Sequence, residues 1–276
     1  MSDASPANAH GTGLGRLATL GAAVEEELAT AGRLAGLSAQ AADRALVGPF
    51  RGERPRWRAW VKQVERAGTG TLPLVALISL LIGMILALQS AHQLQQLGVV
   101  QLVADLVAIS VTRELAPLMT AILVAGRVGS SIAAELGTMK VSQEVDALTV
   151  MGIDPVAYLV VPRLGGLLIA VPCLTFFADA LGILGGSAVG TFVLGLGFSS
   201  YWADSIAALS LEDLWSGVVK SFFFGGLIGL VACQQGLETR GGASAVGRST
   251  TAAVVRSIIL IIAADLIFTA WFYVGK

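Results

Sequence analysis

Five charged residues lie inside long apolar runs of this 276-residue sequence: Arg113, Glu114, Asp179, Lys220 and Asp265. A charged side chain in an apolar layer needs an oppositely charged partner, an aqueous cavity or a route to the polar boundary. Arg113 and Glu114 are adjacent, so on a helix they point about 100° apart and cannot both face one partner directly. One of them is therefore expected to face a cavity.

Pro117 supports a cavity beside Arg113. It stands four residues after Arg113, so it removes the amide that would bond the Arg113 carbonyl and favours a kink. A kinked, charged helix suits a chamber in which Arg113 meets an anionic group of a substrate. The alternative is an ion pair between Arg113 and Asp179 or Asp265 that only fixes helix packing.

Lys220 is expected to have a structural role. Its long side chain could reach outward to the polar boundary, or it could pair with Glu212 or Asp213, which lie about two helical turns earlier.

The sequence offers no catalytic or metal-binding set. It contains no HExxH or GxSxG motif. Cys173 and Cys233 lie inside apolar runs, far in sequence from His10 and His92, so no metal site, cofactor or disulfide is expected. The chain alone is therefore expected not to be an enzyme, and uphill transport would need an ion gradient or another subunit.

Residues 242–249 read GASAVGRS and come close to a phosphate-binding P-loop, with Arg248 in place of the lysine. A P-loop follows a buried strand and opens a soluble helix, whereas this segment separates two apolar runs. We interpret it as a glycine-rich turn in which Ser249 or Thr250 caps the last helix.

The composition indicates an integral membrane protein. Hydrophobic residues make up 55% of the chain and charged residues only 13%, whereas soluble domains carry about 25% charged residues. A helix needs about 20 apolar residues to cross a bilayer, and five stretches qualify: 70–91, 102–128, 164–195, 214–234 and 254–274. Because the first begins so far from the N-terminus, no cleaved signal peptide is expected.

Positive residues gather at alternate connections between these spans. They precede the first span and flank the connections after the second and fourth, at Arg51, Arg54, Arg56, Arg58, Lys62, Arg66, Arg127, Lys140, Arg163, Arg240, Arg248 and Arg256. The connections at 92–101 and 196–213 contain no Lys or Arg. The positive-inside rule then places the N-terminus in the cytoplasm and the C-terminus outside. Since these charges cluster by position, no nucleic-acid partner is expected.

The segment before the first span has the pattern of an amphipathic helix. Trp57, Trp60, Val61 and Val64 follow helical spacing, and basic residues occupy the other face. We expect an elbow helix in the membrane interface, and the alternative is a solvated linker. Residues 14–47 also have a helical pattern.

Residues 140–163, between the second and third spans, are too polar to cross a membrane. Val145, Leu148, Met151 and Gly152 share one helical face, with Glu144 and Asp146 in the first turn. Asp154 and Pro155 then end the helix and allow a second short one. Such a cytoplasmic element could dock into a groove on a soluble partner or lie on the bilayer.

Small residues form ridges on two spans. Gly182, Gly186 and Gly190 are spaced by four on the third span, and Gly225 and Gly229 on the fourth. Such ridges indicate helix packing, within one subunit or between two.

Four segments resemble the permease subunits of MCE-associated ABC transporters, the Mla and YrbE family. They are RELAPLMTAILVAGRVGSSIAAELGTM at 113–139, EVDALTVMGIDP at 144–155, VPR at 161–163 and AVGRSTTAAVV at 245–255. The resemblance extends over about residues 48–275. It divides the chain into an N-terminal helical segment, 1–47, and a permease domain, 48–276.

The resemblance implies an all-α integral membrane protein with five transmembrane helices, an elbow helix and a cytoplasmic coupling helix. It implies a bacterial inner-membrane homodimer on two cytoplasmic ATPases, below a ring of periplasmic MCE-domain proteins, in some members with a STAS-domain subunit. Such a permease would move phospholipid and maintain outer-membrane lipid asymmetry. The alternatives are a proton-coupled secondary transporter using Glu114, Asp179 or Asp265, and a membrane-embedded lipid enzyme.

The resemblance also implies roles for particular residues. The residues expected to line a phospholipid cavity are Leu88, Gln89, Arg113 and Glu114. The residues expected to contact the ATPase are Glu144, Asp146, Leu148, Met151, Gly152 and Asp154.

Overall fold

The computed structural model describes residues 11–46 and 57–274, and every regular element within these ranges is helical. In chain order the elements are α1 (Gly11–Leu46), α2 (Trp57–Leu97), η2 (Val100–Leu102), α3 (Val103–Ser110), η3 (Val111–Leu115), α4 (Ala116–Val124), η4 (Ala125–Gly129), α5 (Ser130–Val141), α6 (Glu144–Val150), η5 (Val156–Val160), α7 (Val161–Phe192), α8 (Phe198–Ala208), α9 (Leu211–Leu237) and α10 (Ala243–Val274). The predicted boundary between residues 47 and 48 lies outside the described residues, as do Arg51, Arg54 and Arg56.

Five helical stretches are long and apolar enough to cross a membrane, which confirms the predicted number of spans. They are Arg58–Leu97, Val100–Val141, Val156–Phe192, Leu211–Leu237 and Ala243–Phe272. The second stretch is much longer than the 102–128 predicted, because the helix continues past the last apolar residues into polar sequence that ends at Val141. Hydropathy locates the segment that can lie in hydrocarbon, whereas backbone hydrogen bonding decides where the helix ends.

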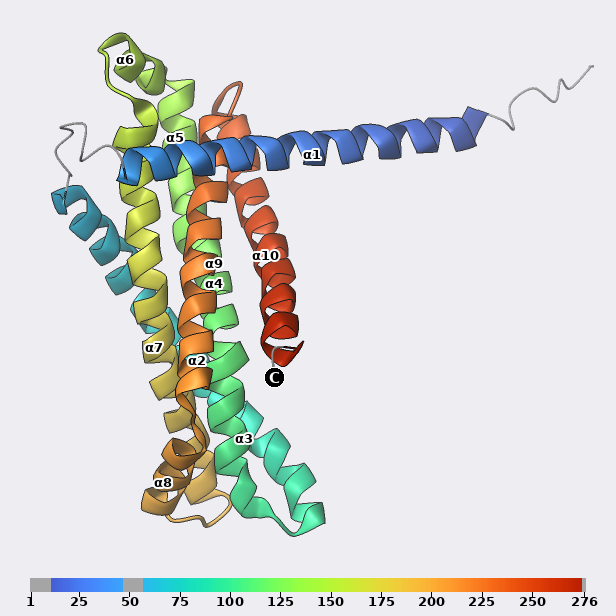
Figure 1. The fold of residues 1–276 in the computed structure, drawn as a ribbon, viewed down its shortest axis with the longest axis vertical. Helices are drawn as coiled ribbons and strands as arrows, with labels where there is room; N and C mark the ends of the chain where they lie inside the picture. The colour runs from blue at the N-terminus through green and yellow to red at the C-terminus, as the bar shows by residue number, and fades with distance from the viewer. Residues whose placement is uncertain (1–10, 47–56, 275–276) are drawn as a thin grey trace, which may run out of the picture.

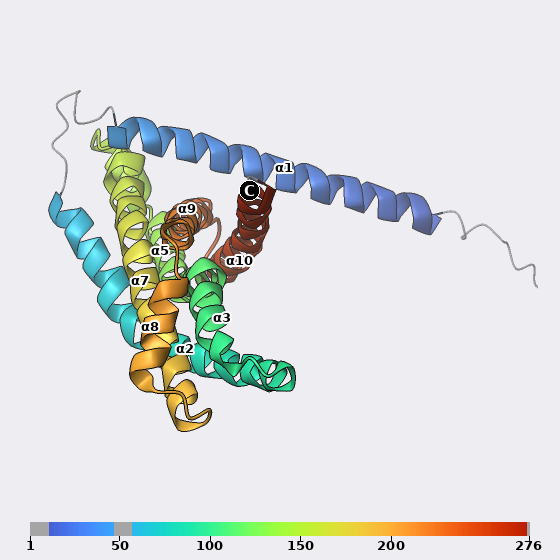
Figure 2. The ribbon, with the colours of Figure 1, turned by 60° about the horizontal axis from the view of Figure 1, so that its bottom comes forward.

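The spans form one bundle, and different helices lie at its two ends (Figure 1). α7 packs between α2 and α9, and α9 in turn packs against α5 and α10. α1 lies across the end of the bundle that carries α6, whereas α3 and α8 lie at the opposite end (Figures 1 and 2). The candidate coupling segment and the α2–α3 connection are therefore at opposite ends.

Glycines allow α2 and α7 to approach closely. A Cβ atom on Gly83 would overlap the carbonyl oxygen of Gly182, and one on Gly185 would overlap that of Leu80. Gly186 and Gly190 leave room for the ring of Tyr201 on α8. The ridge predicted on the third span therefore packs helices within one subunit.

Pro117 lies two residues after a π-helical turn, η3, which contains both Arg113 and Glu114. A π turn adds a residue to the hydrogen-bonded ring, and such turns are common where a helix is interrupted and at functional sites. The regular α-helical hydrogen bonding is thus interrupted at Arg113 and Glu114, just before Pro117, and the kink stays a prediction.

The predicted elbow segment forms the start of α2, which runs without a break from Trp57 to Leu97. The ring of Trp60 packs against Gly165 of α7, where a Cβ atom would lie 2.7 Å from the ring. Val64 also packs against the core, whereas Val61 is exposed. The Trp57 side chain lies outside the described residues, and the interfacial position of this segment stays a prediction.

The predicted cap of the last helix is wrong. α10 begins at Ala243, so all of segment 242–249 except its first residue is helical and does not form the predicted glycine-rich turn. Ser249 and Thr250 lie inside this helix. The turn before α10 is made by Gly241, whose φ of 110° suits glycine. Ser249 instead accepts a hydrogen bond from Thr239, at 2.9 Å between the hydroxyl oxygens.

Candidate functional site

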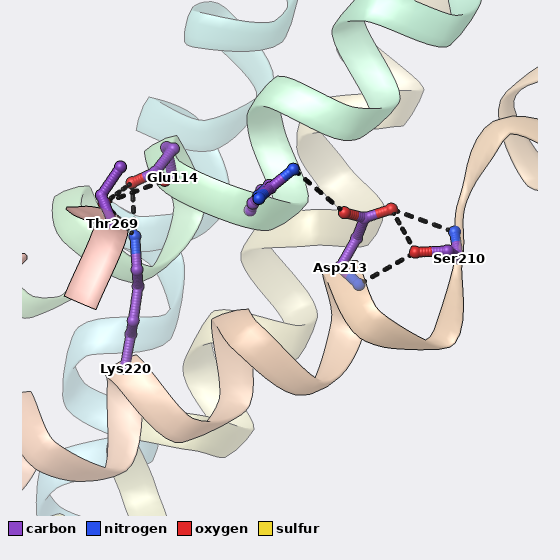
Figure 3. A network of polar contacts seen from close by, with 6 residues as sticks. Glu114, Ser210, Asp213, Lys220 and Thr269 are labelled. Atoms are coloured by element: carbon purple, nitrogen blue, oxygen red, sulfur yellow. Dashed lines mark hydrogen bonds and ion pairs between the residues drawn. The ribbon is translucent and has the colours of Figure 1, made fainter. Parts of the chain in front are cut away.

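Lys220 is the centre of a charged cluster inside the bundle (Figure 3). Its side chain is fully buried, and its Nζ lies 2.5 Å from Glu114 Oε2 and 2.9 Å from Asp265 Oδ1. Nζ also donates to Thr269 Oγ1, at 2.8 Å. The prediction that Lys220 reaches outward or pairs with Glu212 or Asp213 is therefore wrong.

Three spans bring this cluster together. Lys220 comes from α9, Glu114 from the π turn η3 of the second span, and Asp265 and Thr269 from α10. Asp265 and Thr269 are four residues apart and so share one helix face. The Thr269 hydroxyl lies 3.1 Å from Glu114 Oε1 and 3.3 Å from Oε2, which positions the carboxylate.

The cluster is unequally exposed. The Lys220 side chain is 0% exposed, Asp265 15% and Glu114 33%. One ammonium and two carboxylates leave one negative charge in excess when all are ionised. A buried ion pair of this kind costs desolvation energy, and Coulombic attraction with good hydrogen bonding must offset that cost. Among the three charged groups, Glu114 is therefore the most accessible to a polar group of a ligand.

Arg113 faces a different partner from Glu114, as their adjacency predicts. Its Nη1 lies 3.7 Å from Asp213 Oδ1 at the start of α9, so the alternative pairing with Asp179 or Asp265 is wrong. Asp213 is held by a capping box, in which the Ser210 backbone N–H and hydroxyl donate to Oδ2 at 3.1 and 2.6 Å (Figure 3). A distance of 3.7 Å is an ion pair without a hydrogen bond, so the Arg113 guanidinium retains donors for a ligand.

Asp179 stands apart from both pairs. Its carboxyl lies on α7, is 9% exposed, and its Oδ1 has no hydrogen-bond partner among the described residues. A buried polar atom of this kind is uncommon in folded proteins and needs a physical reason.

Leu88 and Gln89 lie on α2, and both side chains are exposed. In the described part of the chain no hydrogen bond or ion pair joins Gln89 to Arg113 or Glu114. A cavity lined by all four residues stays a prediction.

The predicted coupling segment forms a short helix, α6, at the tip of the bundle (Figure 1). Val145 is buried and Leu148 is partly buried against the core, whereas Val150 and Met151 are exposed. Gly152 has a φ of 74°, so it lies outside the helix and ends it instead of extending its apolar face. The predicted second short helix is not a separate element, because the helix that begins at Val156 continues directly into α7.

The acidic residues of this segment are held by neighbours. Ser142 Oγ donates to Glu144 at 2.9 Å, and Lys140 donates to Asp146 at 2.7 Å. Asp154 accepts from the Val156 amide at 2.9 Å and pairs with Arg44 of α1 at 2.8 Å. α1 is therefore tied to the segment, a contact that sequence reasoning did not predict.

Sequence reasoning also missed Thr269 and the role of Asp213. The spacing of Asp265 and Thr269 places both on one face, and that signal could have identified Thr269. The SxxD pattern at Ser210 and Asp213 is the signature of a capping box and could have shown that Asp213 begins a helix.

Comparison with known proteins gives one consistent family. The family model for permease MlaE matches residues 60–271. A probable ABC transporter permease protein of Rickettsia typhi is 41% identical over 209 residues, which are 76% of this chain and 81% of that protein. A probable ABC transporter permease protein of Synechocystis is 34% identical over 78% of this chain and 81% of that protein. The chloroplastic protein trigalactosyldiacylglycerol 1 of Arabidopsis thaliana is 37% identical over 79% of this chain and 63% of that protein.

Proposed function

This chain belongs to the MlaE permease family, and on that premise we propose that it moves phospholipid between the bacterial inner membrane and a periplasmic MCE-domain partner. An ABC transporter permease works with an ATPase, which supplies the energy. In this proposal two copies of the chain assemble with two ATPases on the side of α6, with or without a STAS-domain subunit. The N-terminus is cytoplasmic and the C-terminus periplasmic, and the transport maintains outer-membrane lipid asymmetry.

The observation that carries the proposal is the placement of Arg113 and the Lys220 cluster. Both lie on membrane spans, and both involve the π turn η3. A phospholipid has an anionic phosphate and apolar chains, so a permease for it needs a cation with unused donors beside apolar surface. The name of the Arabidopsis relative, which is that of a galactolipid, supports a lipid as the transported molecule.

Reconstitution with the ATPase tests this function. The chain and its ATPase are placed in liposomes containing a fluorescent phospholipid, and transfer to acceptor vesicles is followed with and without ATP. We expect transfer to require ATP and both proteins. Failure of ATP to increase transfer would contradict the proposal.

The buried carboxyl of Asp179, whose Oδ1 has no hydrogen-bond partner among the described residues, favours one alternative, a proton-coupled transporter. In that case the isolated chain would transport when a pH gradient is imposed, and Asp179→Asn would abolish the activity. A lipid enzyme would instead convert the lipid to a product detectable by mass spectrometry.

Arg113→Ala is expected to lower the phospholipid retained by the purified complex about tenfold, because a charge-assisted hydrogen bond contributes roughly 1.5–3 kcal/mol. Bound lipid is quantified by mass spectrometry. Arg58→Ala, which removes an exposed arginine near the start of α2, is the control and should retain wild-type lipid. Normal lipid content in Arg113→Ala would contradict the proposal that Arg113 binds phospholipid.

Glu144→Lys is expected to uncouple ATP hydrolysis from transfer. The substitution reverses a charge in the first turn of α6 and places a lysine beside Ser142, so docking of the segment is disturbed while the bundle stays intact. ATPase rate and lipid transfer are measured on the same preparation, and transfer should fall at least tenfold while hydrolysis continues. Glu65→Lys, an exposed reversal on α2, is the matched control. Unchanged transfer in Glu144→Lys would refute the coupling role.

A further inference from the structure

A cavity of about 280 Å³ lies between α2 and the second span, away from the Lys220 cluster. Its polar lining comes from Gln63 and Arg66 of α2 and from Arg127, Ser131 and Glu135 of the second span. The three residues from the second span are spaced by four, so they share one helix face. Arg127 lies 13 residues after Glu114, about 20 Å further along the helix axis.

The cavity carries a positive charge that no group among residues 11–46 and 57–274 neutralises. Glu135 is its acidic group, and it pairs with two arginines, with Arg66 at 2.5 Å and with Arg163 at 3.3 Å. In the described part of the chain the Arg127 guanidinium has no ion pair or hydrogen bond. It lies over Gly70, where a Cβ atom would be 3.4 Å from Nη2. An arginine fork with unused donors at a cavity wall is suited to an anion with several oxygens.

The position of the cavity along α2 indicates the depth of the site in the membrane. Before Gly70 the helix is rich in charged residues, and from Leu72 to Leu88 it is apolar. Arg127 therefore lies where the headgroup layer meets the hydrocarbon, on the side of the bilayer that faces α6.

The same face of α2 continues as an apolar stripe. Gln63, Arg66 and Gly70 are followed at steps of three or four by Leu74, Leu77, Leu81 and Ile85, all four of which are exposed. One face of one helix thus presents polar groups and then apolar groups over several turns. The matching ligand has an anionic head and a long apolar chain.

We propose that this cavity binds the phosphate of a phospholipid in the leaflet on the α6 side, with an acyl chain along the stripe of α2. Arg127 donates to the phosphate oxygens, and Ser131 and Gln63 supply further donors. A free phosphate ion offers the same oxygens to Arg127, but it leaves the stripe without a ligand. The site is separate from the proposed transport site, so its occupancy does not depend on Arg113 or Lys220.

Equilibrium lipid binding tests the site. The complex of the full chain and its ATPase, in detergent, is titrated with phosphatidylglycerol and followed by native mass spectrometry. Arg127→Gln should weaken binding of one lipid per chain about tenfold, and Arg127→Lys should weaken it less. Lys62→Gln removes an exposed cation at a similar depth that does not line the cavity, and it should bind as the wild type does.

A second variant separates the site from a loss of folding. Gly70→Val leaves every charge in place and puts a side chain against the Arg127 guanidinium, so it should also reduce binding while the complex keeps its melting temperature. Diacylglycerol with the same acyl chains should not bind at this site, because it lacks the phosphate. Millimolar inorganic phosphate should displace little phosphatidylglycerol.

Two results would overturn this proposal, and a third would count only against the proposed function. Equal lipid binding by wild type and Arg127→Gln would exclude the cavity as a lipid site. Full displacement of the lipid by inorganic phosphate would assign the site to the free ion. Loss of ATP-driven transfer with normal phosphatidylglycerol binding would count against the proposed function but not against this site.

Discussion

Lys220→Met is expected to destabilise the protein by about 3–5 kcal/mol, which is typical when one partner of a buried ion pair is removed. Methionine fills nearly the same volume but carries no charge, so the Glu114 and Asp265 carboxylates would lose the cation between them. The two acidic groups would then repel each other in a site with little water. Thermal unfolding of the purified complex in detergent measures the loss.

Two further variants isolate the electrostatic cause. Lys140→Met breaks an exposed pair with Asp146, and such pairs contribute about 0–1 kcal/mol. The triple variant Lys220→Met, Glu114→Gln, Asp265→Asn neutralises the whole cluster, so it should recover most of the lost stability. A melting temperature of Lys220→Met equal to that of Lys140→Met would contradict the account.

The triple variant also separates folding from transport. If the charges of the cluster serve only to pack helices, the triple variant should transfer lipid as the wild type does once its stability is recovered. If the cluster meets a headgroup, transfer should remain low although the fold is recovered. The expected result under the proposed function is low transfer.

The sequence was sufficient to identify the charged residues but not to pair them. A charged side chain in an apolar run is costly however the helices pack, so all five residues could be selected from their positions in the sequence alone. The partner of Lys220 depends on how α9 faces the second span and α10, and Glu114 is 106 residues away. Asp213 was a reasonable partner by spacing, but its carboxylate is held by Ser210 at the start of α9.

The sequence predicted that the five spans exist better than it predicted where each helix ends, because helix ends also depend on backbone conformation and on contacts between distant segments. Hydropathy reports which residues tolerate hydrocarbon, and it gave five spans, all of which are found. Helical spacing predicted an apolar face that extends to Gly152, but the left-handed conformation of Gly152 places this residue outside α6. The contact between Arg44 and Asp154 joins two segments that are far apart in sequence, and no local pattern encodes it.

Gly83→Leu is expected to separate α2 from α7 and to destabilise the protein by about 3 kcal/mol, the upper end of the usual cost of overpacking. The new side chain would begin where the Gly182 carbonyl oxygen lies. Backbone cannot move aside as a flexible side chain can, so the helices themselves must shift. Thermal unfolding and protease sensitivity of the purified complex both report this change.

Gly68→Leu makes the same substitution on the same helix at a position with no atom within 4 Å of the added Cβ. It should be neutral or slightly stabilising, because leucine favours a helix over glycine by up to about 1 kcal/mol. The contrast between the two variants therefore measures helix approach and not helix propensity. Equal stability of Gly83→Leu and Gly68→Leu would mean that the α2–α7 contact is loose enough to admit a side chain. That result would contradict the close approach of the two helices described above.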